Sequence, residues 1–293
     1  MLNYVKSKWR TAHVSENHLK LNSYLRLNKK TFEIYNINDA VPNLIIVGSQ
    51  KCGTSSLHYY LDEHPNIYMS APIKEAGYFI FDEWGKDYWE KRGDKIDTKL
   101  DLKRNYTITD RYINQKYDGD SSTHYTIGNR VQDYDIPLVI KKESPKAKII
   151  YLIRNPFARV TSAYYHFVKY HKFTDSIDDF ILKYKSVIST TLFFDQIKPF
   201  AELFSGNLLL LNFEDLIKNT KIVMNKTYKF LELEPHNHEE FRVYNKTSPN
   251  KSSKFSRDSY DNLSTIFTRQ KVLMEGYFNI ELNWDLTEKT WVI

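Results

Sequence analysis

The sequence is poor in cysteine: Cys52 is the single one among 293 residues. A disulfide within the chain is therefore impossible, and zinc sites built from several cysteines are excluded. Long apolar runs are also missing, since no stretch approaches the roughly 20 apolar residues that span a bilayer. Residues 1–43 are polar and lack the apolar core of a signal peptide. Together these absences predict a cytoplasmic protein without a transmembrane segment.

The chain also lacks a strong excess of charge. Its formal net charge is +6, spread over 42 basic and 36 acidic residues. A nucleic-acid-binding protein would carry a dense basic stripe, so we expect no nucleic acid partner, whereas a small anionic ligand fits the mild positive charge. Hydrophobic residues make up 41% of the chain, which is enough for a sizeable core and excludes a disordered protein.

Three short apolar runs predict buried strands, and each is followed by a helical pattern. The runs are Leu44–Val47, Lys148–Ile153 and Asn207–Phe213. The first helical pattern begins near Thr54, the second has Pro156 in its first turn, and the third continues to about Leu233. Strands that alternate with helices indicate a parallel sheet covered on both faces. The sequence therefore predicts an α/β, P-loop-like fold of three layers, with a central parallel sheet flanked by helices.

The domain organisation follows from a change in composition near residue 41, where apolar runs begin. Residues 1–40 are mixed and charged, and we interpret them as an N-terminal extension before a single domain of residues 41–293. Within that domain, residues 82–118 and 234–262 are polar and rich in turn formers. We expect both stretches to be irregular and to border a site at the carboxyl ends of the strands.

The loop between the first strand and its helix is a candidate phosphate site. It contains, in order, Gly48, Ser49, Gln50, Lys51, Cys52, Gly53, Thr54 and Ser55. Backbone N–H groups and a helix N-terminus at this place can surround an oxyanion. A kinase or ATPase would have lysine where this chain has Thr54, and Lys51 lies inside the loop instead. The loop keeps the backbone groups that surround a phosphate but lacks the lysine that usually contacts the β- and γ-phosphates. This combination fits a nucleotide with a 5'-phosphate but no triphosphate–Mg²⁺ unit. The alternative is a strand–helix turn that binds nothing.

A second anion site is predicted after the second strand. Arg154 ends that strand and Ser162 lies two turns along the following helix, so both could hold one phosphate. Arg159, in the same segment, could instead be a solvated helix residue that binds no phosphate. Two anion sites at the ends of two strands indicate a nucleoside with phosphates at both ends.

With these two segments in place, the chain resembles the sulfotransferases that use 3'-phosphoadenosine 5'-phosphosulfate (PAPS), and among them the carbohydrate branch with the heparan sulfate sulfotransferases and bacterial relatives. The resemblance covers about residues 42–233, with a weaker tail to Trp284. Further segments similar to the family stand in the expected order, at residues 70–79, 82–89, 120–125 and 209–216. The segment 245–254 resembles the cofactor-covering loop only loosely.

The resemblance implies roles for the residues of both anion sites. Lys51 would contact the bridging oxygen of PAPS, while Thr54, Ser55 and the amides of the loop would hold the 5'-phosphate. Arg154 and Ser162 would hold the 3'-phosphate. Lys251 and Lys254 would close over the phosphates of the adenosine, unless they are simply solvated. The product would be 3',5'-adenosine bisphosphate, and no metal is required by the resemblance or provided by an evident ligand pattern.

The acceptor side is also assigned by resemblance. We expect Glu75 to be the general base, although a surface glutamate paired with Lys74 is the alternative, and His124 is the rival base. Lys74, Asp120, Ser122 and Tyr125 are expected to contact the acceptor. The implied reaction is transfer of a sulfuryl group from PAPS to a hydroxyl group of a carbohydrate. An anionic glycan is one form that this carbohydrate acceptor could take.

Two other classes of protein stay open at this point. A kinase acting with ATP–Mg²⁺ is disfavoured by Thr54 in the lysine position, but Asp215 after the third strand could bind magnesium. A non-catalytic module that grips a nucleotide or glycan is the second alternative. Retention of Lys51, Glu75 and Arg154 argues against it.

Overall fold

A computed structural model describes residues 41–70, 74–82, 115–126, 135–242, 244, 253–287 and 291. In this part of the chain, parallel strands form one sheet in the order β2-β3-β1-β4-β5. The strands are β1 (Leu44–Gly48), β2 (Ile67–Met69), β3 (Tyr117–Asp120), β4 (Lys148–Ile153) and β5 (Leu208–Asn212). The prediction of an α/β fold with a central parallel sheet is confirmed, while the extension assigned to residues 1–40 lies outside the described residues.

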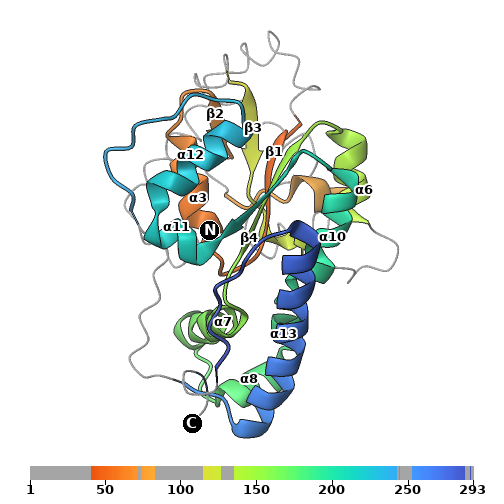
Figure 1. Cartoon of the computed structure of the whole chain (residues 1–293), viewed down its shortest axis with the longest axis vertical. Helices are drawn as coiled ribbons and strands as arrows, with labels where there is room; N and C mark the ends of the chain where they lie inside the picture. The colour runs from red at the N-terminus through yellow and green to blue at the C-terminus, as the bar shows by residue number, and fades with distance from the viewer. Residues whose placement is uncertain are drawn as a thin grey trace.

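Helices cover both faces of the sheet (Figure 1). On one side lie α3 (Thr54–Asp62), α11 (Phe213–Lys218) and α12 (Thr220–Phe230), and on the other lie α6 (Ile136–Glu143) and α10 (Phe193–Leu203). Short 3-10 helices η3 (Tyr78–Ile80) and η5 (Thr123–Thr126) follow β2 and β3 along the chain. The remaining helices are α7 (Pro156–His171), α8 (Ile177–Lys183), α9 (Ser186–Ser189) and α13 (Arg257–Phe278).

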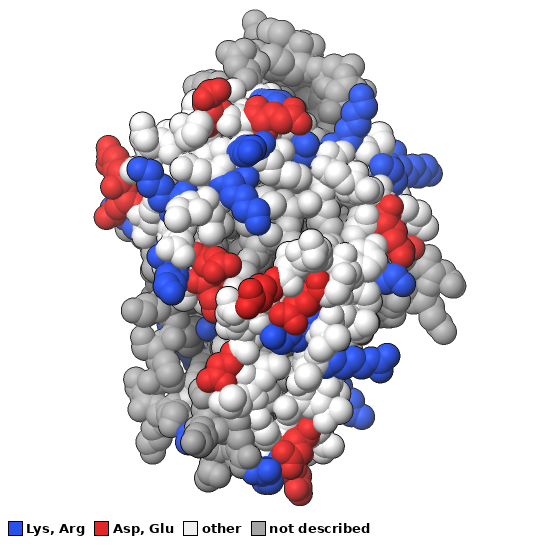
Figure 2. Space-filling view, viewed as in Figure 1, with Lys and Arg blue, Asp and Glu red and all other residues white. Residues whose placement is uncertain are grey.

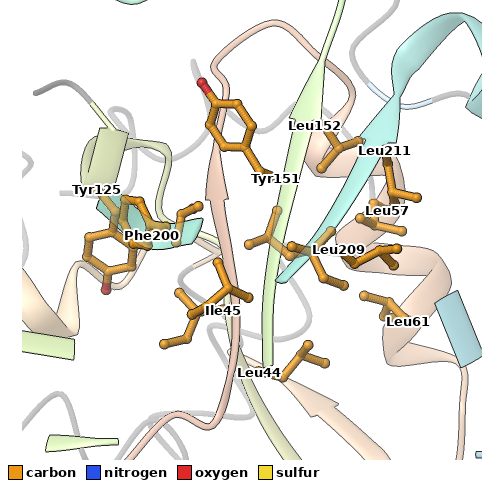
Figure 3. Packing of buried hydrophobic residues seen from close by; sticks show 14 of the residues in the cluster. Leu44, Ile45, Leu57, Leu61, Tyr125, Tyr151, Leu152, Phe200, Leu209 and Leu211 are labelled. Carbon is orange, nitrogen blue, oxygen red and sulfur yellow. The ribbon is translucent and has the colours of Figure 1, made fainter. Parts of the chain in front are cut away.

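The central strands are apolar along their whole length because both of their faces are covered. Every residue of β1 is buried, as are the last five of β4. Leu57 and Leu61 of α3 pack on one side of the sheet, and Phe200 of α10 lies on the other (Figure 3). Each such side chain contributes about 1.5–3 kcal/mol through its removal from water. These contacts fix the strands in register, so that the loops after β1, β3 and β4 emerge at one edge.

A second apolar cluster joins α7, α8 and α13 beside the sheet (Figure 1). Phe157 at the start of α7 is at its centre, with ring contacts to Phe255, Tyr260 and Phe267. The expectation that residues 234–262 are irregular is therefore wrong from Arg257 onward. Ser256 caps α13 by accepting a hydrogen bond from the Ser259 amide.

The polar stretch 82–118 also contains a strand that the sequence did not indicate. Its last residues begin β3, whose Tyr-Asp-Gly-Asp sequence lacks an apolar run. Gly119 fits there because a Cβ atom would overlap the Met69 sulfur of the neighbouring strand β2. Within the described part of the chain, no helix has both the length and the apolar character needed to cross a bilayer.

Candidate active site

The predicted phosphate loop lies between β1 and α3 with its backbone sharply turned. Gly53, the N-cap residue of α3, has a φ of 90°, and a Cβ atom there would approach a Phe213 ring carbon to 2.8 Å. Only glycine combines that left-handed conformation with so close a neighbour. The loop therefore brings the first-turn amides of α3, at Thr54 and Ser55, to a place where an oxyanion can bind.

Two loop side chains are turned away from that place. Ser49 is buried, donating its amide hydrogen to Leu152 O at 2.8 Å and its hydroxyl hydrogen to Thr190 O at 3.1 Å. Cys52 is fully buried, and burial raises the pKa of its thiol to about 12. Ser49 and Cys52 could therefore contribute to the predicted phosphate site only through their backbone. Gln50 contributes its carbonyl group to the loop's anchoring, and ligand binding by the loop as a whole stays a prediction.

Lys51 has an environment that suits an anion. Its backbone is left-handed, with a φ of 70°, and its ammonium nitrogen lies 3.4 Å from Nδ1 of His166 on α7. Burial, with Arg154 and Arg159 nearby, lowers the pKa of Lys51 to about 8. An anion bound at this cluster of positive charges would offset their repulsion.

This pKa predicts that nucleotide binding takes up a proton. At pH 9, roughly nine-tenths of the Lys51 amines would be neutral before binding, and a bound phosphate favours the ammonium form, which returns the pKa toward the ordinary value of 10.5. Calorimetry in buffers of different ionisation enthalpy should show uptake of close to one proton at pH 9 and little at pH 7. Lys51→Ala should abolish the uptake, and equal proton uptake by this variant and the wild type would contradict the assignment.

Arg154 lies at the carboxyl end of β4, where its guanidinium turns toward the loop. It donates to Lys51 O at 3.0 Å and stacks 4.3 Å from the centre of the Phe213 ring. Its Nε is buried without a hydrogen-bond partner among the described residues. Since a buried charged donor is costly when unsatisfied, this atom fits a site that an anion completes. Ser162 is half-buried two turns along α7.

Arg159 is the main residue for which the sequence interpretation is wrong. It is 1% exposed and therefore not a solvated helix residue. Its Nε donates to Gln50 O at 3.0 Å, and its Nη1 donates to Val187 O at 2.6 Å and to Thr191 Oγ1 at 3.0 Å. One guanidinium thus fastens the phosphate loop to α9 and to the turn after it, and burial lowers its pKa to about 10.

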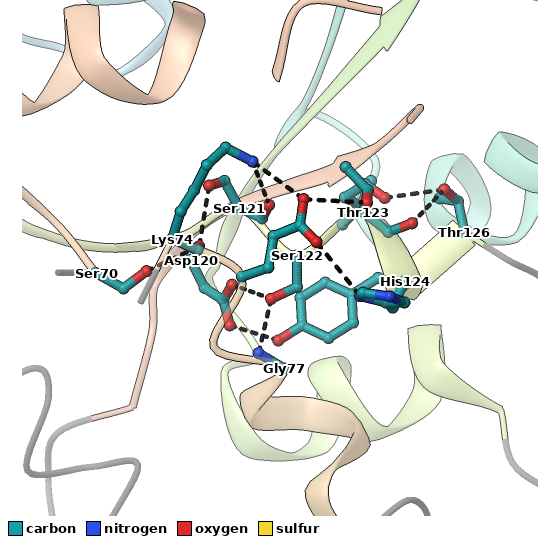
Figure 4. Close-up of polar contacts among 12 residues, drawn as sticks. Ser70, Lys74, Gly77, Asp120, Ser121, Ser122, Thr123, His124 and Thr126 are labelled. Carbon is teal, nitrogen blue, oxygen red and sulfur yellow. Dashed lines mark hydrogen bonds and ion pairs between the residues drawn. The ribbon is translucent and has the colours of Figure 1, made fainter. Parts of the chain in front are cut away.

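Glu75 and His124, predicted as rival bases, lie together on the β2–β3 side of the sheet. His124 Nδ1 is 3.7 Å from Glu75 Oε2, and the two side chains are 20% and 26% exposed. Glu75 Oε1 accepts hydrogen bonds from Lys74 Nζ at 3.3 Å and from Thr123 Oγ1 at 3.4 Å, contacts that Figure 4 marks around Lys74, Thr123 and His124. The surface-pair alternative for Glu75 is only half right, because Lys74 is its partner but is buried. Lys74 also donates to Ser121 O, so it supports Glu75 instead of facing an acceptor.

Asp120, Ser122 and Tyr125 differ from the expectation that they contact the acceptor. All three are buried, and Asp120 accepts short hydrogen bonds of 2.5 Å from Ser122 Oγ and from the Tyr125 hydroxyl (Figure 4). The three side chains also accept hydrogen bonds from the backbone amides of Gly77, Tyr78 and Phe79. A closed network of this kind positions the chain that carries Glu75 and leaves none of the three side chains turned to solvent.

Direct bonds join the two halves of the site. Thr126 Oγ1 donates to Val47 O at 3.0 Å, next to the phosphate loop, and His58 of α3 is 2.7 Å from Ser121 Oγ. A Cβ atom at Gly48 would overlap Thr126 Oγ1. The segment after β3 is therefore packed onto the start of the phosphate loop.

The last predicted cofactor residues lie in a segment that is described in part. Lys251 lies outside the described residues, and Lys254 is half-buried. Next to it, the Ser253 amide donates to the Tyr165 hydroxyl of α7 at 2.6 Å, one turn beyond Ser162. The backbone beside Lys254 is thus held on the helix that carries the second anion site, while its contact with a cofactor stays a prediction.

The magnesium ligand of the kinase alternative is not supported. Asp215 lies within α11 as an exposed residue, and its carbonyl accepts from the Asn219 amide. It therefore does not end a strand beside the phosphate loop, which weakens the kinase interpretation.

Comparison with known proteins agrees with this geometry. The model of the sulfotransferase domain family matches residues 41–277. A sulfotransferase structure from Alicyclobacillus acidocaldarius has the same fold, with a TM-score of 0.66 and 24% identity over 83% of this chain and 97% of that one. The human bifunctional heparan sulfate N-deacetylase/N-sulfotransferase 2 is 27% identical over 44% of this chain and 13% of its own length. The Dictyostelium discoideum membrane-associated sulfotransferase kil1 is 30% identical over 45% of this chain and 24% of its own.

The region shared with this chain makes up only 13% and 24% of the length of these two curated relatives. The match of the family model extends from the strand before the phosphate loop to the end of α13. The chain belongs to the sulfotransferase domain family.

Proposed function

We propose that this chain transfers a sulfuryl group from PAPS to a hydroxyl group of a carbohydrate. The observation that carries the proposal is the buried Nε of Arg154 beside Lys51 and the phosphate loop, for which no residue in the described part of the chain is a hydrogen-bond partner. A nucleotide with a 3'-phosphate and a 5'-phosphosulfate would supply an anion to each of the two sites. The carbohydrate acceptor is supported by the relative that is named for heparan sulfate.

The donor half of the site would hold the nucleotide through charge and amides. In the proposed reaction PAPS supplies the activated sulfuryl group. The amides at Thr54 and Ser55 bind the 5'-phosphate, and the ammonium of Lys51 stabilises negative charge on the oxygen that leaves with it. Arg154 and Ser162 bind the 3'-phosphate, while Arg159 holds the loop in shape from behind. Positioning and charge stabilisation of this kind are what group transfer to an oxygen nucleophile needs.

The acceptor half would remove the hydroxyl proton. Glu75 accepts that proton as the acceptor oxygen forms its bond to sulfur and the bond from sulfur to the phosphate oxygen breaks. Lys74 and Thr123 orient one carboxylate oxygen of Glu75, and the other oxygen lies 3.7 Å from His124 Nδ1, so the half-buried carboxylate is held in place for the acceptor hydroxyl. On the face in Figure 2, described basic and acidic side chains are interspersed, so we assign acceptor recognition to the site and not to that surface.

The first test is binding of 3',5'-adenosine bisphosphate, measured by calorimetry against ADP and ATP–Mg²⁺ as competitors. The wild type should prefer the bisphosphate, and Arg154→Ala should weaken its binding about 10- to 100-fold, since hydrogen bonds to charged groups are the strong ones. Arg269→Ala, an exposed arginine of α13, is the matched control and should bind as the wild type does. A preference for ATP–Mg²⁺ would contradict the proposal and favour a kinase. Absence of nucleotide binding would favour the glycan-binding module.

A further inference from the structure

A group of possible metal ligands lies outside the site described above, at the far end of α3. Glu63, His236 and His238 each offer one ligand atom, and these three atoms all lie within 4.8 Å of one another. Glu63 is the C-cap residue of α3, whereas both histidines belong to the irregular segment that follows α12. The rings of His236 and His238 are 5.0 Å apart and nearly perpendicular.

His238 is held in a fixed orientation by partners on both ring nitrogens. Nδ1 lies 2.6 Å from Glu63 Oε2, and Nε2 lies 2.7 Å from the hydroxyl of the buried Tyr228. Metal-binding histidines usually have a hydrogen-bonded group on the nitrogen that does not bind the metal, because it fixes the ring and its tautomer. Tyr228 has that position here, so Nδ1 is left to share a cation with Glu63.

The fourth polar residue nearby, His64, has its own partners and adds no charge. Its Nδ1 accepts from the Asn66 amide at 3.0 Å, and its Nε2 is 3.1 Å from Glu234 O. This pair of bonds defines a neutral ring. Its ring is 5.7 Å from that of His236. A cation between Glu63 and the two histidines would therefore meet one carboxylate oxygen and two imidazole nitrogens.

We propose that Glu63, His236 and His238 form a binding site for a divalent transition metal of the zinc type. Two imidazoles and one carboxylate match the ligand preference of Zn²⁺, with water in the fourth position, whereas Mg²⁺ and Ca²⁺ prefer oxygen ligands. The metal replaces the hydrogen bond between Glu63 and His238, and the hydrogen of the neutral His238 ring then lies on Nε2, where the Tyr228 hydroxyl accepts it. The ligands come from distant parts of the sequence, which is why no motif indicated them.

The position of this site gives it a structural task. Beyond His238 the chain runs back along α3: the Tyr60 hydroxyl donates to Arg242 O at 2.7 Å, and the Tyr244 amide donates to Ser56 Oγ at 3.3 Å. Ser56 is in the first turn of α3, next to the phosphate loop. A metal at Glu63 fastens the beginning of this returning segment to the helix that starts at the phosphate loop.

The experiment uses the full chain, freed of any affinity tag and of metal, with Co²⁺ as the probe. Visible absorption should report one tetrahedral Co²⁺ per chain, displaced by one equivalent of Zn²⁺ and not by Mg²⁺. His236→Ala should weaken Co²⁺ binding about 100-fold or more, because outer partners of a metal alone change affinity 10- to 100-fold. His171→Ala, an exposed histidine of α7, is the control and should bind like the wild type.

Thermal unfolding keeps the test independent of the absorption signal. Zn²⁺ should raise the Tm of the wild type and of His171→Ala, and leave that of His236→Ala unchanged. His236→Ala is preferred to His238→Ala because His238 also contacts Tyr228, so its loss could unfold the segment. Wild-type binding of Co²⁺ no tighter than about 100 μM, far weaker than structural metal sites, would overturn the proposal. Equal binding by wild type and His236→Ala would overturn it as well.

Discussion

An alanine at position 51 should lower kcat for sulfuryl transfer by about 100- to 1,000-fold, the usual loss when one preorganised donor to a developing negative charge is removed. The structure gives the reason: the half-buried Lys51 lies at the phosphate loop near Arg154 and Arg159, where a charge is screened less than in bulk water. Affinity for 3',5'-adenosine bisphosphate should fall as well, because the bound phosphate is what favours the Lys51 ammonium, whereas kcat at saturating PAPS reports only the lost stabilisation of the transition state. Steady-state rates and calorimetry measure the two effects separately.

Lys198→Ala is the control for this substitution, since Lys198 of α10 is exposed and pairs with Glu202 across one helical turn. It should keep wild-type activity, as surface pairs of this kind contribute little. Full activity of the Lys51→Ala variant with PAPS would remove Lys51 from the reaction. An unchanged kcat together with weaker nucleotide binding would make it a binding residue only.

Glutamine at position 75 should lower kcat about 100- to 10,000-fold, the range for loss of a general base. The amide keeps the shape of the side chain and its contacts with Lys74 and Thr123, but it no longer accepts a proton. Bisphosphate affinity should be unchanged, since Glu75 lies on the β2–β3 side of the sheet. The measurement is kcat across pH, in which the variant should lose the acidic limb of the wild-type profile.

His124→Gln is the comparison that separates the two candidate bases. With Glu75 as the base, this variant should lose about tenfold or less, because His124 acts on the reaction only through its contact with Glu75 at 3.7 Å. A large loss for His124→Gln together with a small one for Glu75→Gln would transfer the base role to the histidine. Glu75 would then orient its ring.

The parts of the fold that the sequence predicted are those determined by contiguous residues. β4 was predicted at its observed bounds, and β1 and β5 within a residue or two, because buried strands of a parallel sheet are unbroken apolar runs. β3 was not predicted, since its Asp and Gly residues pack through backbone and hydrogen-bond contacts. The helix beginning at Arg257 was missed because the polar residues around its N-terminus obscured its apolar face.

The candidate site divides in the same way. Lys51 and Arg154 were identified because each stands in a short motif at the end of a strand, where local chain geometry determines its direction. The burial of Arg159 depends on Val187 and Thr191, which lie far along the chain, so no local pattern shows it. The pairing of Glu75 with His124 likewise requires β2 and β3 to be neighbours, which only the folded sheet shows.

The strand order has a consequence for how this protein can change. β1 lies at the middle of the sheet, with β3 on one side and β4 on the other. The groups that we assign to the nucleotide follow β1 and β4, and those that we assign to the acceptor follow β2 and β3. Substitutions in separate halves with no shared partners combine with additive free energies. A library in the segments after β2 and β3 that keeps Ser121 and Thr126, the residues bonded to the nucleotide half, could therefore explore new acceptors while the nucleotide half is inherited unchanged.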